Sequence, residues 1–351
     1  MGRTAWDTRT VPRQLAIPVD AQLVGADGEG LAAFAAAAEH AGIARLWAPE
    51  LHRSATVPLA VAALATERVE LATGIALAFT RSPMTLALEA LDIDQLSGGR
   101  FVLGLGAGVR RLNVDWHAAP YDPPLRRMRE LVAAVRELVA ALASGRDARS
   151  PGRLYDIRVT GLRRGLAAPR ERVPVWLAAV LPGMTRLAGE IADGFLDHPV
   201  TTPAWLAERL LPALDEGAGR AGRARPEVAG ALICAVSDED PAAAREAAAA
   251  TVGFYATVRT YEGMFAEHGF GDRLAGIRRA FMTGDPARLA EAVGEDMTEA
   301  FAAAGAADAV RARTAAYEGL ADRLWAAPPH HLQPPEAPAR WQAGILAALG
   351  G

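Results

Sequence analysis

Eight short runs typical of β-strands alternate with longer helical segments, and this alternation restricts the fold more than any other feature of the chain. The runs cover residues 15–20, 44–50, 68–79, 100–106, 173–180, 193–200, 227–237 and 321–328. Strands that are separated by helices pair in parallel. Eight such units favour an α/β fold of the closed (β/α)8 TIM-barrel type over an open sheet.

Two segments interrupt the alternation. Residues 144–173 are rich in Arg, Gly and Pro, and they predict a surface excursion between strands four and five, with a small hairpin in RLYDIRVTGL. Residues 238–320 predict a mainly helical insertion between strands seven and eight, because Asp-Pro pairs are typical of helix starts. We therefore expect a single domain over residues 1–351, with its core in residues 14–328.

Composition excludes several classes of protein. The net charge is −4, with a pI near 6.0, which argues against a nucleic-acid partner. The chain contains no lysine, so neither a lysine Schiff base nor a P-loop is available. A single cysteine, Cys234, forms no internal disulfide and fits a cytoplasmic location.

The ends and the overall residue usage give three further expectations. The N-terminal MGRTAWDTRTVPRQ lacks the apolar core of a signal peptide. No apolar run reaches the roughly 18 residues of a membrane span. Heavy use of Ala, Arg, Gly and Pro without lysine is typical of a GC-rich genome, such as that of an actinobacterium.

Three alternating glycines close the fourth run in SGGRFVLGLGAGVRR, residues 97–111. Gly104, Gly106 and Gly108 spell G-x-G-x-G, whereas a dinucleotide fingerprint requires G-x-G-x-x-G on the first strand of its unit. Val109 stands where that third glycine would be. At the carboxyl end of a barrel strand, these glycines indicate either close approach to a flat ligand or tight packing.

Several stretches together resemble the bacterial luciferase-like monooxygenase superfamily, in particular its branch that uses the deazaflavin coenzyme F420. The central one is ATERVELATGIALAFTRSPMTLALEALDIDQLSGGRFVLGLGAGV, and ARLWAPE, VWLAAVLPGMTRLAGEIADGFLDHP and VGFYATVRTYEGMFAEHGFGD support it. The resemblance covers most of residues 14–328.

The resemblance implies a flavin-type ring in the barrel mouth, backed by a bulge on strand three at Gly74–Ile75, where the peptide is either cis or trans. The residues that it implies for cofactor binding are Gly74, Ile75, Gly106, Ala107, Gly108, Ala178, Ala179, Val180, Leu181, Gly183, Met184 and Thr185. The last of these open a helix, whose N-terminus suits a phosphate. Relatives commonly have glycine at the position of Leu181, so this loop departs from the family pattern.

The candidate catalytic residues are Glu50, His52 and His198, each near the end of a predicted strand. Glu50 and His52 both reach the site if strand two continues through them, because alternate residues face the same side. A carboxylate beside an imidazole suits proton transfer. The alternatives are that Glu50 pairs with a neighbouring arginine, that His52 lies in a loop and that His198 only caps its strand. Arg81 is expected to anchor the loop before Ser82.

The resemblance implies hydride transfer between coenzyme F420 and a small organic substrate. The alternatives are an FMN-dependent two-component monooxygenase of the same fold and a barrel that binds such a cofactor without catalysis. Some relatives use a glutamate just after the strand-four glycines, and Val109 stands there in this chain. The paired histidines His330 and His331 lack partner ligands in the sequence, so no metal is expected. Relatives are often dimers, which implies a homodimer.

Overall fold

The computed structural model describes residues 16–350, and the N-terminal stretch considered for a signal peptide lies outside them. Two compact units make up the described chain. The β2–β9 unit comprises residues 45–196 and 210–227. The β10–β12 unit comprises residues 16–44, 197–209 and 228–350.

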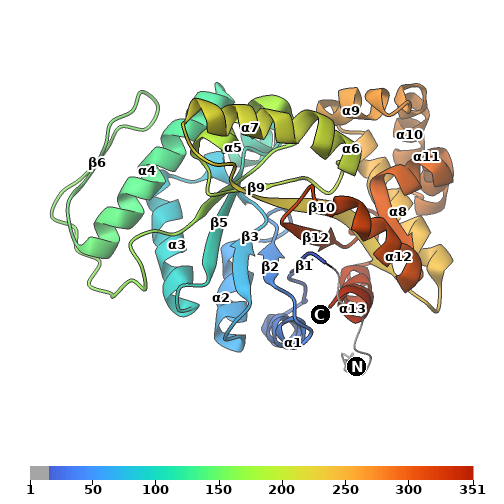
Figure 1. Ribbon diagram of the computed structural model, residues 1–351, viewed down its shortest axis with the longest axis horizontal. Helices are drawn as coiled ribbons and strands as arrows, with labels where there is room; N and C mark the ends of the chain where they lie inside the picture. The colour runs from blue at the N-terminus through green and yellow to red at the C-terminus, as the bar shows by residue number, and fades with distance from the viewer. Residues whose placement is uncertain (1–15, 351) are drawn as a thin grey trace. The chain divides into compact units, whose positions relative to one another are not determined.

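The β2–β9 unit is built on parallel strands that are buried over nearly their whole length. In sheet order they are β2 (Arg45–Ala48), β3 (Glu70–Thr73), β5 (Phe101–Gly106), β8 (Val175–Ala178) and β9 (Gly194–Leu196). The helices of this unit are α2 (Thr56–Ala65), α3 (Pro83–Leu96), α4 (Pro124–Ser144), α5 (Pro182–Ile191) and α7 (Leu211–Arg220), of which the first four join these strands. Helices α3 and α4 lie side by side (Figure 1).

Aromatic side chains fill the interior of this unit. The indoles of Trp47 and Trp176 meet edge to face at 5.7 Å, and both residues are buried, as expected for core tryptophans. The guanidinium of Arg45 lies 4.3 Å from the Trp176 ring centroid and donates to Glu70 at 2.9 Å. A buried charge is thus stacked on aromatic rings and paired at the same time.

A one-residue bulge divides the third predicted strand into β3 and β4 (Ala76–Leu77). Ala72 pairs with Val102 and Ala76 pairs with Leu105, so three residues of one strand face two of the other. The expected bulge is therefore present. The Gly74–Ile75 peptide within it is cis.

The expected surface excursion contains a hairpin, but only its second strand lies within RLYDIRVTGL, and its first strand begins five residues before that stretch. Strands β6 (Ala148–Ser150) and β7 (Ile157–Val159) pair antiparallel. The segment PGRLYD connects them, and they form a separate two-stranded sheet.

The strands of the β10–β12 unit also pair in parallel. Its strands in order are β1 (Val19–Gln22), β12 (Arg323–Ala327), β10 (Glu227–Val236) and β11 (Ala302–Gly305). Its helices are α1 (Gly28–His40), α6 (Pro203–Trp205), α8 (Pro241–Ala256), α9 (Glu262–Glu267), α10 (Leu274–Phe281), α11 (Pro286–Phe301), α12 (Ala307–Thr314) and α13 (Ala337–Leu349). None of the helices in the described residues combines the length and apolarity needed to cross a bilayer.

The insertion between the last two barrel-type strands is helical except for β11. Helices begin at Pro241 and Pro286, as the Asp-Pro pairs predict, and each preceding aspartate accepts a backbone N–H. The sequence AAAG of β11 has no strand propensity, yet Ala302 pairs with Ile233 of β10. Tertiary pairing therefore overrides local preference at this segment.

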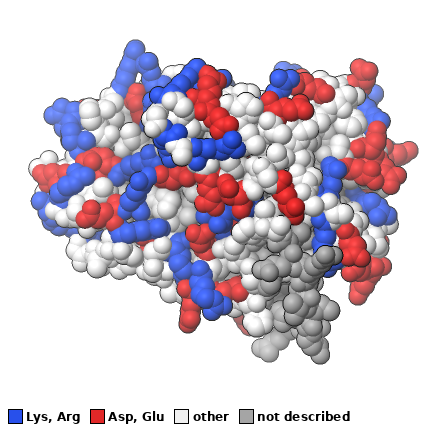
Figure 2. All heavy atoms as spheres, in the orientation of Figure 1, with Lys and Arg blue, Asp and Glu red and all other residues white. Residues whose placement is uncertain are grey.

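Charged side chains of both signs are interspersed over the face drawn in Figure 2. Many arginines are paired, for example Arg146 with Glu137 at 2.6 Å and Arg273 with Asp296 at 2.6 Å. These exposed pairs contribute little stability individually, but they break up any surface of a single sign.

Gly189 of α5 and Gly217 of α7 allow these two helices to pack backbone to backbone. A Cβ on Gly217 would lie 1.9 Å from the carbonyl oxygen of Arg186, whereas one on Gly219 would meet nothing within 4 Å. We expect Gly217→Ala to lower the free energy of unfolding by about 1–3 kcal/mol through overpacking. Gly219→Ala should be neutral or stabilise by up to about 1 kcal/mol. Urea titrations of both variants test this, and equal effects would contradict it.

Candidate functional site

Ligands of parallel α/β sheets bind outside the carboxyl ends of the strands. In the β2–β9 unit, those ends carry Glu50 after β2, the bulge before β4, the glycine segment after β5 and the loop from β8 into α5. In the β10–β12 unit, Asp197 and His198 open the segment that follows β9, and His330 follows β12. Most of the residues predicted for the site therefore lie at strand ends.

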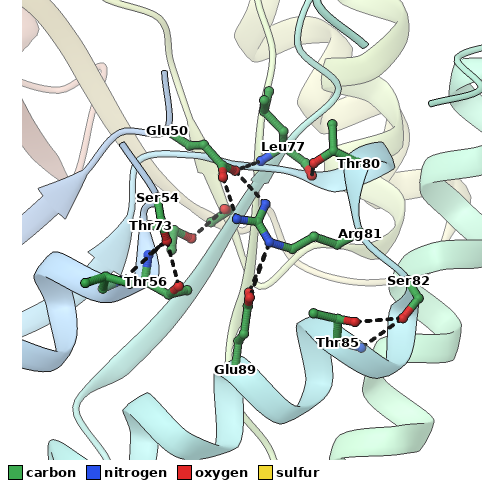
Figure 3. A network of polar contacts seen from close by, with 12 residues as sticks. Glu50, Ser54, Thr56, Thr73, Leu77, Thr80, Arg81, Ser82, Thr85 and Glu89 are labelled. Carbon is green, nitrogen blue, oxygen red and sulfur yellow. Dashed lines mark hydrogen bonds and ion pairs between the residues drawn. The ribbon is translucent and has the colours of Figure 1, made fainter. Parts of the chain in front are cut away.

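Glu50 holds the segment that follows the bulge (Figure 3). Its carboxylate accepts a hydrogen bond from the Leu77 amide at 2.7 Å and from Nη1 of Arg81 at 2.7 Å, and Nη2 of Arg81 donates to its other oxygen. The side chains are only 11% and 15% exposed. The pairing with an arginine is the alternative that the sequence left open for Glu50, and an acid–base role for this residue stays a prediction.

Arg81 in turn links the bulge to α3. Its Nε lies 3.3 Å from a carboxylate oxygen of Glu89, and the next residue, Ser82, caps α3 by accepting the Thr85 amide N–H at 3.0 Å. The hydrogen bond to Glu50 raises the pKa of Arg81, and burial raises the pKa of Glu89 against the attraction of Arg81. Arg81 thus anchors the loop before Ser82, as the sequence indicated.

His52 does not share a strand face with Glu50. Strand β2 ends at Ala48, and His52 lies exposed in a bend two residues beyond Glu50. Strand β2 does not continue through Glu50 and His52, so the strand alternation that would place both side chains on one face is absent.

The glycines of β5 are explained by packing against the bulge. A Cβ on Gly104 would lie 2.0 Å from the carbonyl oxygen of Thr73, and one on Gly106 would lie 2.0 Å from Cδ1 of Ile75. Gly108 has φ of +61°, a conformation that favours glycine. The neighbouring Ala107 carbonyl accepts from the buried Asn113 amide at 2.8 Å. Direct cofactor contacts by Gly106, Ala107 and Gly108 stay predictions.

The loop after β8 leaves the start of α5 without a side-chain cap. Leu181 occupies the N-cap, Pro182 has no N–H, and the amides of Gly183 and Met184 form the first turn. The Thr185 hydroxyl donates to the Leu181 carbonyl at 3.1 Å, so it serves the turn itself. Uncapped first-turn N–H groups are an anion site. Ala178, Ala179 and Val180 lead into it, and Leu181 is 43% exposed.

His198 has a fixed tautomer in the β10–β12 unit. The Val200 amide donates to its Nδ1 at 3.1 Å, so the neutral imidazole carries its proton on Nε2. Burial lowers the pKa of His198 to about 3, with a further lowering by His330. The ring is therefore neutral, and Nε2–H acts as a donor.

Asp197, the residue before His198, was not among the sequence candidates. It is buried, and its carboxyl accepts from the His198 amide at 2.8 Å and from the Thr201 hydroxyl. Burial raises the pKa of Asp197 to about 7, while these hydrogen bonds act in the opposite direction. The sequence signal that could have identified Asp197 is an aspartate at the end of a predicted strand, directly before a histidine.

Aromatic residues of the insertion surround His198. We call this set the His198 cluster; it contains His198, Phe254, Tyr255, Tyr261, His330 and His331. Tyr255 meets the His198 ring at 4.9 Å and Tyr261 meets it at 5.2 Å. His331 stacks on Phe254 at 3.4 Å. Among the described residues, no group of three or more His, Cys, Asp or Glu side chains is arranged to hold a metal ion.

Comparison with known proteins assigns the chain to a family. The sequence profile of luciferase-like monooxygenases matches residues 12–324. A protein of Mycobacterium tuberculosis whose function is uncharacterized is 33% identical over 90% of this chain and 91% of its own. A second protein of that organism, named provisionally as a coenzyme F420-dependent oxidoreductase, is 30% identical over 82% of this chain and 87% of its own.

A solved structure gives the fold. The coenzyme F420-dependent tetrahydromethanopterin reductase from Methanopyrus kandleri superposes with a TM-score of 0.79 at 23% identity, over 95% of this chain and 97% of the other. The fold is a (β/α)8 TIM barrel, as the strand–helix alternation predicted. The chain belongs to the luciferase-like monooxygenase family, a family of enzymes.

The pair of Glu50 and Arg81 should matter for stability. We expect Glu50→Gln to lower the free energy of unfolding by about 2–4 kcal/mol, because it leaves the Arg81 guanidinium partly buried without its carboxylate. Asp115→Asn is the matched control, since Asp115 pairs with Arg111 at an exposed site, and it should change stability by less than about 0.5 kcal/mol. Chemical denaturation checks both, and a Glu50 effect as small as the control would refute the holding role.

Asp197 and His198 should give opposite pH dependences of stability. Because the pKa of Asp197 is raised, the native protein binds a proton at this carboxyl more tightly than the unfolded protein does. The contribution of Asp197 to the free energy of unfolding therefore falls as pH rises from about 4 to 7. Because the pKa of His198 is lowered, its contribution to the free energy of unfolding rises as pH increases from about 3 to 6.5. We therefore expect Asp197→Asn to gain stability relative to wild type as pH rises from 4 to 7, measured by urea midpoints. Parallel profiles would contradict the assignment.

Proposed function

We propose that this protein is an oxidoreductase that transfers a hydride between coenzyme F420 and a small organic substrate. The observation that carries the proposal is the first turn of α5, which has no side-chain cap and has open space at Gly183. Membership of the luciferase-like monooxygenase family and similarity to a relative named for this coenzyme support it.

The residues present fit such a cofactor. A Cβ on Gly183 would meet only Leu125, at 3.9 Å, so there is space above the first turn of α5. The amides of Gly183 and Met184 would bind the phosphate, with Ala178, Ala179, Val180, Leu181 and Thr185 shaping the turn. When bound, the deazaflavin supplies two-electron hydride chemistry.

The other residues position the cofactor and enclose its binding site. Gly74 and Ile75 form the bulge, Gly106 and Gly108 permit its close packing, and Glu50 with Arg81 keeps Leu77 and the following turn in place. Holding reactants in a fixed orientation is the protein's main contribution to hydride transfer. His198, whose imidazole is neutral, and His52 remain candidate catalytic residues.

Equilibrium titration of the purified protein with coenzyme F420 and with FMN tests the proposal. We expect micromolar or tighter binding of F420 and much weaker binding of FMN. Quenching of tryptophan fluorescence reports the binding of each. Preferential binding of FMN would favour the two-component monooxygenase. Tight F420 binding with no turnover of any alcohol, imine or enone would favour a non-catalytic barrel.

A charge at the start of α5 should weaken the cofactor specifically. Gly183→Asp places a carboxylate at the phosphate position, and we expect its Kd for F420 to rise at least about tenfold through repulsion and loss of the anion site. Gly183→Ala adds a methyl group to open space, so it should bind like wild type. Equal affinities of the two variants would exclude α5 as the phosphate site.

Three expectations from the sequence stay predictions: a single domain over residues 1–351, a homodimer and a cytoplasmic location. For the homodimer, α2 offers an apolar stripe, because Val57 is 66% and Leu64 is 76% exposed. Sedimentation of wild type and Leu64→Asp would test whether this stripe joins two copies.

A further inference from the structure

A pocket of about 370 Å³ lies between α4 and the strands β5 and β8 of the β2–β9 unit. We call it the α4 pocket. Five aliphatic residues that are each at most 3% exposed line it: Leu103, Val135, Val139, Val173 and Val175. Its volume is within the range of about 300–1,000 Å³ that is typical of small-molecule pockets. The aliphatic part of the α4 pocket therefore suits an apolar group of a small ligand.

Three charged residues, Arg136, Glu171 and Arg172, complete the lining of the α4 pocket. The two arginines share one carboxylate. Nη2 of Arg136 donates to Oδ2 of Asp193 at 2.9 Å, and Nη2 of Arg172 donates to Oδ1. The Val175 amide also donates to Oδ2, at 2.9 Å. Because one carboxylate balances only one of two guanidinium charges, the arginine side of the pocket carries excess positive charge.

Glu171 supplies a negative charge to the same pocket. It is exposed, and within residues 16–350 its carboxylate forms no ion pair. Arg146, which it attracts from a greater distance, is itself paired with Glu137 at 2.6 Å. The α4 pocket thus combines a carboxylate that has no cation in contact with a pair of guanidinium groups that have one carboxylate between them.

Arg136 has a donor that is not used. Its Nε–H is buried and has no hydrogen-bond partner among residues 16–350. Buried donors normally have a partner, because an unpaired one has lost its bond to water. The bond to Asp193 therefore satisfies Arg136 only in part, although its side chain is 30% exposed. Donor capacity for an anionic group remains on the arginine side of the pocket.

These three features together select a ligand class. A guanidinium group favours a carboxylate, and the aliphatic lining favours an apolar chain. An ordinary fatty carboxylate leaves Glu171 without a cation, and a simple amine leaves the excess positive charge of the arginines without an anion. A molecule that carries a carboxylate, an ammonium group and an aliphatic side chain on one carbon matches all three features.

We propose that the α4 pocket binds a zwitterionic α-amino acid with a branched aliphatic side chain. The carboxylate of the ligand pairs with Arg172 and Arg136, its ammonium group pairs with Glu171, and its side chain packs among the aliphatic residues. The inference is independent of the proposed function, because none of these residues belongs to the proposed cofactor site and all of them lie within the β2–β9 unit.

The test is a titration of the full chain with L-leucine as the probe, followed by NMR of labelled valine methyl groups. We expect saturable shifts of the Val135 and Val139 methyl resonances. Nuclear Overhauser effects between these methyl groups and the leucine side chain locate the probe in wild-type protein without any substitution. Glycine, which lacks the side chain, and 4-methylpentanoate, which lacks the ammonium group, should both bind more weakly than leucine.

Glu171→Gln tests the contact with the ammonium group. We expect the Kd for leucine to rise about two- to fivefold, as for loss of an exposed charge pair. The same substitution should not weaken binding of 4-methylpentanoate, which has no ammonium group. An equal rise of both Kd values would show that Glu171 does not recognise the ammonium group, and it would overturn the assignment of a zwitterion.

Ala140→Leu tests the location. Ala140 also lines the α4 pocket, so a leucine side chain there should occupy the space and abolish binding of the probe. Ala133→Leu is the matched control, because Ala133 lies exposed on the same helix, and it should bind leucine like wild type. Equal binding by the two variants, or no saturable binding of leucine to wild type, would overturn the inference. Neither result bears on the titration with coenzyme F420, which tests the proposed function separately.

Discussion

The bulge between β3 and β4 is the constraint on which the rest of the β2–β9 unit depends. The extra residue opposite β5 takes backbone polar groups out of the regular strand pairing, and these groups need other hydrogen-bond partners. Glu50 binds one of them, the Leu77 amide, and Arg81 ties that carboxylate to α3. The same displacement brings Thr73 and Ile75 so close to β5 that only glycine fits at positions 104 and 106.

The neutral donors of the β10–β12 unit have a related cause. Asp197 and His198 are adjacent residues whose charged forms are both disfavoured by burial. Their opposite effects on stability partly compensate between about pH 4 and 6.5, because one group favours acid and the other favours base. Burial thus keeps His198 available as an N–H donor, while backbone and hydroxyl groups satisfy Asp197.

The sequence predicted the strand–helix alternation and the helix starts because local signals determine them: apolar runs, Ser82-Pro83 and the Asp-Pro pairs. The bulge was expected only from the family resemblance. It could not decide between packing and ligand contact for Gly104 and Gly106, because that depends on which atoms of β3 face them. Strand β11 was missed because AAAG pairs only through its tertiary neighbour.

The central claim is that backbone around the bulge and the first turn of α5 holds a phosphate-bearing redox cofactor. Hydrogen–deuterium exchange of the full-length protein, with and without saturating coenzyme F420, tests it most directly. The account predicts slower exchange at the amides of residues 74–78 and 183–185 when the coenzyme is bound. Binding of the coenzyme with unchanged exchange in both segments would contradict the account.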